Sequence, residues 1–304
     1  MPSSVSALYE PMIARELDSV RPAVAEFRRT ASAEELYFAV ARFAVLAYAP
    51  SQHAKHAVMA ALAAHDLREE LGDRWEELLA ECAYYAAASR QPWSEPPMMD
   101  PPDPGDDTTG DAGELRAAVR DRDRLRAERW LARRLDDPAI GRDLVAVAAE
   151  DPADQGMKLI VTDAALRLAA ILGEKGRYVT LRMAVWELTA YGGSEAATRP
   201  EVEAATLLNR LIARSVAEEG SLESARAVFH FAAAHGRNVM ESVGAPETRV
   251  PIYRLARDLA GTLIAHAVAK RLRADFPNAP LDAFLAAVHH NLETAPSLED
   301  WSFA

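Results

Sequence analysis

The 304-residue sequence contains one cysteine, few aromatic residues and no excess of basic side chains. Cys82 alone cannot form an intramolecular disulfide or a metal site built only from cysteines. A formal net charge of −12 argues against nucleic acid and anionic membrane surfaces as partners, because both require a basic face. No apolar run approaches the ~18 residues of a membrane span, and the N-terminal residues lack the basic start and apolar core of a secretory signal. We therefore expect a cytoplasmic protein that binds neither nucleic acid nor membranes.

The short motifs of the common enzyme classes are missing as well. There is no dinucleotide fingerprint, no phosphate-binding Gly-rich loop, no Gly-x-Ser-x-Gly and no His-Glu-x-x-His. No glutamate stands three positions before a histidine, which excludes the Glu-x-x-His pairs of ferritin-like di-iron bundles. The dipeptide His65-Asp66 resembles the dyad of metal-dependent phosphohydrolases, but the place where that family carries its dyad holds Ala83-Tyr84-Tyr85 here. The sequence therefore specifies no reaction.

Alanine and helical periodicity are what the sequence does have. Half of the residues are hydrophobic, only 7% are aromatic, and alanine is the best helix former. Ser32 and Glu35 form a capping-box pattern before an apolar run. The pattern predicts an all-α protein, either a multi-helix bundle or stacked helical hairpins. The expected helices span Ser6–Arg29, Ala33–Tyr48, His53–Leu71, Trp75–Ser89, Leu115–Leu135, Asp143–Ala149, Met157–Gly173, Val179–Tyr191, Glu201–Glu219, Leu222–Val243, Pro251–Asp275 and Leu281–Glu293.

A proline-rich stretch over residues 91–113 interrupts the helical pattern and reads as a linker or a long surface loop. It separates an N-terminal helical part, residues 1–90, from a C-terminal helical part, residues 114–304, and we expect the two to pack as one globular unit. The segment 56–65 matches 226–235 at equal spacing, with a histidine at the end of each. This match raises the possibility of an internal duplication.

The phase of the histidines along the expected helices gives the candidate site. His53 and His56 fall on one arc with small alanines. The opposite side carries the charged residues Lys55, Asp66 and Glu69 alongside Val58 and Leu62, and His65 lies on that other side and cannot join the pair. An i,i+3 histidine pair can converge on one metal ion or one ligand atom. The apolar helix faces that carry His266 and His289 supply further candidates.

Two interpretations of these histidines stand side by side. In the first, His53, His56 and His266 bind iron, zinc or manganese, and His289 and Tyr84 line the same ligand site. In the second, each histidine forms its own hydrogen bonds in the core or at its boundary, and Tyr84 is a core aromatic residue.

Two segments carry a loose family resemblance. Residues 154–160 open an Ala/Leu-rich helix, and residues 227–235 read AVFHFAAAH. Together they resemble the all-helical domain associated with bacterial Rieske-type proteins and, more distantly, the questin-oxidase-like helical family. The resemblance implies an association with oxidative metabolism. Met157 and Thr162 stand where a histidine would be expected, and one cysteine cannot supply the two thiolates of a Rieske cluster.

These observations predict a helical pocket protein that binds a metal ion or a small organic ligand through inward histidines. If it is an enzyme, a metal-dependent oxidoreductase is the class that this site would fit. The alternative is a non-catalytic helical scaffold that binds a protein partner along an Ala-rich groove. The small-residue helix faces are also compatible with a homodimer.

Overall fold

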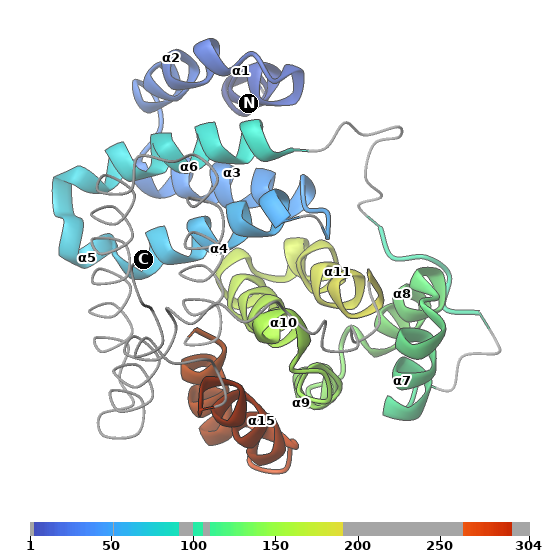
Figure 1. Ribbon diagram of the computed structural model, residues 1–304. Coiled ribbons are helices and arrows are strands. Elements are labelled where there is room, and N and C mark those ends of the chain that lie inside the picture. Colours follow the sequence, from blue (N-terminus) through green and yellow to red (C-terminus); the bar gives the residue numbers. More distant parts are fainter. Residues whose placement is uncertain (1–2, 51, 91–99, 106–109, 191–263, 294–304) are drawn as a thin grey trace, which may run out of the picture. The chain divides into compact units, whose positions relative to one another are not determined.

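The computed structural model describes residues 3–50, 52–90, 100–105, 110–190 and 264–293 (Figure 1). Within these ranges the chain forms helices and connecting loops and no strand, which confirms the all-α prediction. None of the helices in the described ranges is long and apolar enough to cross a membrane. The expected helices over residues 201–219 and 222–243, and the match at residues 226–235, lie outside the described residues.

The chain divides into two compact units. The first comprises Met1–Gly141 and Ala164–Gly192, and the second comprises Arg142–Asp163 and Gly193–Ala304. The proline-rich stretch over residues 91–113 therefore falls within the first unit.

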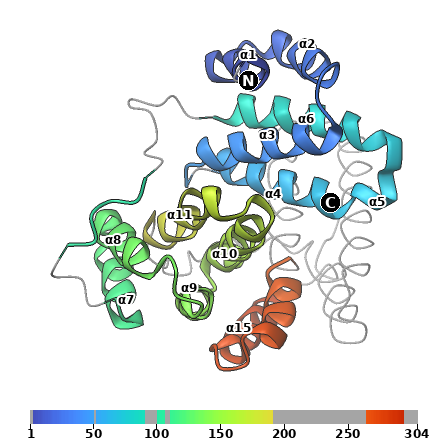
Figure 2. The ribbon, with the colours of Figure 1, turned by 180° about the vertical axis from the view of Figure 1, so that it is seen from behind.

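In the first unit, two groups of helices surround the core. Helix α6 packs against α1, α2, α3 and α4, and α11 packs against α3, α7 and α8 (Figures 1 and 2). Large side chains such as Leu36, Phe43 and Trp130 are fully buried between these helices. The helices are α1 (Ser3–Ala14), α2 (Leu17–Arg28), α3 (Ala33–Leu46), α4 (Gln52–Asp66), α5 (Arg68–Leu71), α6 (Trp75–Ser89), α7 (Ala112–Asp121), α8 (Arg124–Arg134) and α11 (Glu174–Ala190), with a 3₁₀ turn, η1 (Gly72–Arg74), before α6.

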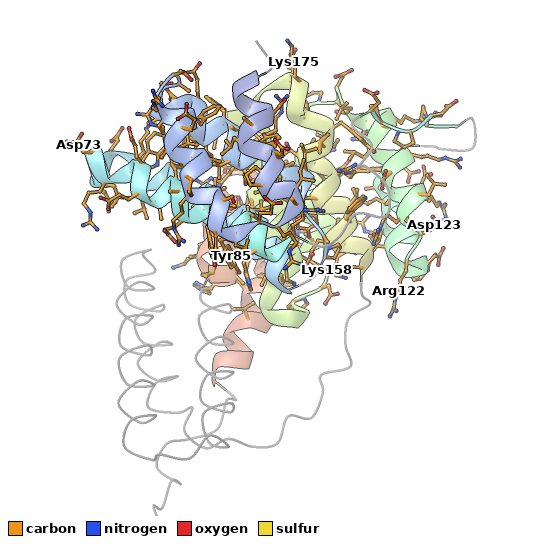
Figure 3. All side chains as sticks on the ribbon, turned by 90° about the horizontal axis from the view of Figure 1, so that it is seen from above. Asp73, Tyr85, Arg122, Asp123, Lys158 and Lys175 are labelled. Carbon is orange, nitrogen blue, oxygen red and sulfur yellow. The ribbon has the colours of Figure 1, made fainter. Side chains whose placement is uncertain are left out.

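The helix predicted over His53–Leu71 is interrupted at Leu67, between α4 and α5. Two further helices that the periodicity predicted as continuous are also broken in two. The first break separates α1 from α2 at Arg15, and the second separates α7 from α8 at Arg122; both arginines have positive φ, 58° and 55°. The side chain of Asp123 then accepts a hydrogen bond from the backbone N–H of Arg126 and caps α8. Arg122 and Asp123 lie together at this turn (Figure 3). Apolar periodicity continues across both breaks, so it did not reveal them.

The start of α3 confirms the capping box. Ser32 accepts a hydrogen bond from the backbone N–H of Glu35, and the Glu35 carboxylate accepts one from the backbone N–H of Ser32. These bonds hold the pKa of Glu35 below its ordinary value. The cap fixes where α3 begins, and with it the position of Tyr37 in the first turns of the helix.

The second unit contains most of α9 (Ile140–Ala148), the first part of α10 (Ala153–Leu172), helical residues 264–275 and α15 (Leu281–Glu293). Gly156 has a φ of +72°, and a Cβ built on it would lie 2.7 Å from Ala265 Cβ and from Phe284 Cζ. Glycine therefore allows the three segments to approach closely at this point. Buried Lys158 also pairs with Asp151 in this unit, at 2.7 Å.

Candidate functional site

The residues predicted to form the histidine site belong to different units. His56 is half-buried on α4 in the first unit, and His266 is buried in the second, with 8% of its surface exposed. The side chains of His53 on α4 and His289 on α15 lie outside the described residues. Tyr84 is half-buried on α6, with the guanidinium of Arg21 4.2 Å from its ring centroid. The convergence of the histidines on one metal stays a prediction.

The buried face of α4 is wider than the one that the sequence pattern indicated. Lys55, Val58 and Leu62, predicted to lie opposite the inward histidines, are all buried, while Ala63 is exposed. Ala57 and Ala64 of the predicted alanine stripe are buried as well, so α4 buries residues of both arcs. This face also carries His65, ten residues after Lys55.

Lys55 is buried because it has an acidic partner on α11. Its Nζ lies 3.1 Å from Oε1 of Glu187, which is fully buried, and the hydroxyl of Tyr48 donates a hydrogen bond to the other carboxylate oxygen. The pair joins residues 132 positions apart. Removing both charges from water is costly, so each partner depends on the other.

A second buried polar cluster joins α8 to α11. The Glu128 carboxylate accepts hydrogen bonds from the hydroxyl of Tyr178, at 2.9 Å, and from the indole N–H of Trp186. The guanidinium of Arg182 lies 4.6 Å from the centroid of the Trp186 ring. Burial lowers the pKa of Arg182 and, with the Glu128 charge, raises that of Tyr178. Each of these polar groups has a partner, and the hydrogen bonds of the cluster stabilise the packing of α8 against α11.

The third cluster, which we call the Tyr37 site, differs because two of its buried polar atoms have no hydrogen-bond partner. It comprises Tyr37 on α3, His65 and Asp66 at the end of α4, Trp75 at the start of α6, and Arg167 on α10. Tyr37 is buried, with 1% exposed. Across the described residues, neither its hydroxyl nor Nδ1 of His65 makes a hydrogen bond. Nδ1 of His65 lies 3.6 Å from Oδ1 of Asp66, which is too long for one.

Aromatic rings surround Tyr37. Its ring stacks on Trp75, with centroids 5.8 Å apart, and meets the His65 ring at 5.4 Å. Phe38 lies edge-on at 5.7 Å. The indole N–H of Trp75 donates a hydrogen bond to the carbonyl of Ala64, at 2.8 Å, and so ties the stack to α4.

Charged groups lie at the more exposed side of the Tyr37 site. Arg167 pairs with Asp66 at 2.5 Å, and both side chains are about one-third exposed or more. Burial first, and then the charge of Asp66, raise the pKa of Tyr37 above its ordinary value. The Tyr37 hydroxyl therefore remains protonated around neutral pH and can both donate and accept a hydrogen bond.

Cys82 lies near this site but offers no nucleophile. Burial raises the pKa of its thiol to about 11, and the Sγ atom lies 3.7 Å from the carbonyl of Ala60. A protonated, buried thiol is a poor nucleophile and metal ligand. Within the described part of the chain, no group of three or more histidine, cysteine, aspartate or glutamate side chains is arranged to hold a metal ion.

Sequence reasoning did not select the Tyr37 site. It placed His65 on the side of α4 away from His53 and His56 and dismissed the His65-Asp66 dyad with the phosphohydrolase pattern. The Ser32–Glu35 cap followed by Tyr37 and Phe38 was a usable signal, because it placed two adjacent aromatic residues in the first turns of a helix. The contribution of Arg167, 101 residues from Asp66, carries no local signal.

Comparison with known proteins adds no family. No protein-family model matches the chain, and neither a curated protein nor a solved structure shows significant similarity to it. The resemblance to the Rieske-associated and questin-oxidase-like helical families stays a prediction.

Proposed function

We propose that the chain is a helical small-molecule-binding protein whose ligand binds at the Tyr37 site. The proposal is carried by the hydroxyl of Tyr37, which is buried and has no hydrogen-bond partner among the described residues. A buried polar group without a partner costs about 1–3 kcal/mol of stability. A phenylalanine would fill the same space without that cost, so the hydroxyl is best explained by a bound molecule.

The neighbouring groups support the same conclusion. Nδ1 of His65 is a second buried atom without a hydrogen bond, and its ring contacts that of Tyr37. Few polar groups on an otherwise apolar wall are the usual composition of a small-molecule site. Asp66 and Arg167 extend the polar lining toward solvent.

The metal form of this function, with His53, His56 and His266 as ligands, and an oxidoreductase activity remain proposals that rest on the sequence alone. So does the alternative of a scaffold for a protein partner. The large apolar side chains that are exposed in the described ranges are spread over four helical segments: Val5 and Ile13 lie on α1, and the others are Phe38, Leu125 and Ile264. They do not favour that alternative over ligand binding.

The test of the proposal is the Tyr37→Phe variant of the full chain, compared with Tyr9→Phe. Tyr9 donates a hydrogen bond to the carbonyl of Ala39 at 2.8 Å, so its hydroxyl already has a partner. We expect Tyr37→Phe to raise or maintain the free energy of unfolding, because it removes an unsatisfied group, and Tyr9→Phe to lower it by about 1 kcal/mol. Urea denaturation measures both.

Ligand-observed NMR with a library of fragment-sized compounds supplies the second half of the test. The proposal requires at least one compound that binds the wild type and the Tyr9→Phe variant but is lost in Tyr37→Phe. Binding that is indifferent to Tyr37, or a library without binders, would contradict it. A large loss of stability in Tyr37→Phe would also count against it, because the hydroxyl would then have a structural partner.

A further inference from the structure

Helix α7, helix α8 and the turn between them form a basic surface on an acidic chain. Residues 112–134 hold eight arginines and four acidic residues, a local charge of +4, whereas the formal charge of the whole chain is −12. Two of the four acidic residues, Glu114 and Glu128, are buried and accept hydrogen bonds from groups inside the first unit. The positive charge of this segment is therefore concentrated at its surface.

Three arginines of this segment have no acidic partner among the described residues. The guanidinium groups of Arg122, Arg124 and Arg129 form neither a hydrogen bond nor an ion pair within the part of the chain that the structure describes. Arg124 lies over the ring of Trp186, at 4.7 Å from its centroid. Asp123, which follows Arg122 at the turn (Figure 3), uses its carboxylate to cap α8. These three cations can therefore bind an anion from outside the unit.

The positions of the arginines are unfavourable for folding. The first turn of a helix carries partial positive charge and is stabilised by acidic side chains. Helix α8 has no acidic residue in its first turn and carries Arg124 and Arg126 there. Arg122 precedes them with a φ of 55°, a conformation that glycine adopts at less cost. Residues that break local rules in this way are expected at functional sites, here one that binds an anionic partner.

An exposed leucine lies within the same surface. Half of Leu125 is exposed, at 50%, and Arg129 follows it by four positions, one turn along the same face of α8. Carboxylates and phosphates both bind arginine, but an apolar side chain beside the arginines favours a partner that presents apolar groups as well. One leucine is too small an apolar face for insertion into a membrane, and the acidic chain as a whole repels the phosphates of nucleic acid.

We propose that the α8 surface, which comprises Arg122, Arg124, Leu125 and Arg129, binds an acidic segment of a partner protein that also presents apolar side chains. The arginines bind carboxylates of the partner, and Leu125 contacts its apolar side chains. The inference goes beyond the proposed function, because the α8 surface shares no residue with the Tyr37 site.

Three labelled peptides of equal length test the partner class: EELEELEEL is acidic and apolar, QQLQQLQQL is apolar without charge, and EESEESEES is acidic without apolar groups. Each is titrated into the full chain by fluorescence anisotropy. We expect the first peptide to bind about tenfold more tightly than either of the others. Its affinity should fall severalfold between about 50 mM and about 300 mM NaCl, because salt screens exposed charges. A labelled DNA duplex and vesicles that contain phosphatidylserine serve as the competing anionic partners.

Variants of the arginines locate the binding surface. Arg122→Gly/Arg124→Gln/Arg129→Gln removes the three cations and should weaken binding of the acidic, apolar peptide about tenfold or more. Arg122→Gly alone should weaken it about twofold to threefold. The same single variant should maintain or raise the midpoint of urea denaturation, because glycine tolerates the positive φ. A loss of binding without a loss of stability would assign the role of Arg122 to binding.

The matched control is Arg29→Gln/Arg74→Gln/Arg273→Gln. It removes three exposed arginines that are each paired with an acidic residue, and it changes the net charge by the same amount. We expect this control to bind the acidic, apolar peptide as the wild type does, within about twofold. Equal losses in the two triple variants, or no binding of this peptide to the wild type, would overturn the proposal. Tighter arginine-dependent binding of the DNA duplex or the vesicles would overturn the partner class.

Discussion

At the scale of single residues, buried charged side chains of the first unit have polar partners in other segments of the chain. The carboxylate of Glu187 binds the ammonium of Lys55 and the hydroxyl of Tyr48, and the carboxylate of Glu128 accepts hydrogen bonds from Tyr178 and Trp186. A buried ion pair adds little net stability over an apolar pair, but the loss of one partner leaves a charge without compensation. The Tyr37 hydroxyl is the contrasting case, because its cost is not offset within the described residues.

Lys55→Met tests this dependence. Methionine keeps most of the side-chain volume but leaves the fully buried Glu187 without its ammonium partner. We expect the free energy of unfolding to fall by about 3–5 kcal/mol, measured by urea denaturation. The double variant Lys55→Met/Glu187→Gln should recover part of this loss, because the amide is uncharged and its oxygen can still accept from Tyr48.

The control for this variant is Arg21→Met. Arg21 pairs with Glu81 at 2.8 Å, but both side chains are more than half exposed, so we expect almost no change in stability. Equal effects of Lys55→Met and Arg21→Met would show that burial does not strengthen the dependence of Glu187 on Lys55. A double variant less stable than the single one would contradict the role of the unmatched charge.

At the scale of elements, helices with clear local signals were predicted well. The bounds of α6 and α15 match their expected ranges residue for residue, and α3 begins at its predicted capping box. The breaks at Arg15 and Arg122 were missed because a positive φ at a non-glycine residue depends on surrounding contacts and leaves no mark on apolar periodicity. The inward face of α4 was predicted only in part, because Val58 and Leu62 are buried together with Ala57 and Ala64 of the alanine stripe.

Gly156 is the element-scale feature with the clearest consequence. Gly156→Ala places a Cβ at a φ of +72° and 2.7 Å from both Ala265 Cβ and Phe284 Cζ. We expect a loss of about 3 kcal/mol from the combined backbone strain and overpacking. Hydrogen exchange measured by mass spectrometry should become faster in residues 264–275 and α15.

Gly173→Ala separates the two contributions. Gly173 has the same φ of +72°, but no atom lies within 4 Å of a Cβ built there. Its variant should show only the backbone cost, about 1 kcal/mol, with unchanged exchange in α15. If both variants were equally destabilised, the close approach of Ala265 and Phe284 to Gly156 would be of no energetic importance.

At the scale of the whole molecule, the all-α class followed from composition, but the candidate site did not. The Tyr37 site joins α3, α4, α6 and α10, and its Arg167 is 101 residues from Asp66. Helical phase within one segment can indicate which residues share a face. It cannot indicate which distant residue reaches that face, so Lys55 was expected on a polar side and His65 was set aside.

The histidine hypothesis makes a separate prediction for the whole chain, because its ligands His56 and His266 belong to different units. If His53, His56 and His266 bind a metal, protein purified without a histidine tag contains about one iron, zinc or manganese ion per chain. The ion is then lost in His53→Ala/His56→Ala, as elemental mass spectrometry measures. A metal bound only by the folded chain also stabilises it, by about 2.7 kcal/mol at a free concentration one hundred times the dissociation constant.

The matched control for the metal test is His65→Ala, which removes a histidine from the opposite face of the same helix. Under the histidine hypothesis this variant keeps its metal and its metal-dependent stability, because His65 cannot share a ligand sphere with His53 and His56. Under the Tyr37-site proposal the same variant weakens the binding of a library compound that depends on Tyr37, whereas His53→Ala/His56→Ala does not. The pair of variants thus assigns any bound species to one face of α4. Loss of metal in His65→Ala would exclude the predicted ligand set, and loss of compound binding only in His53→Ala/His56→Ala would exclude the Tyr37 site.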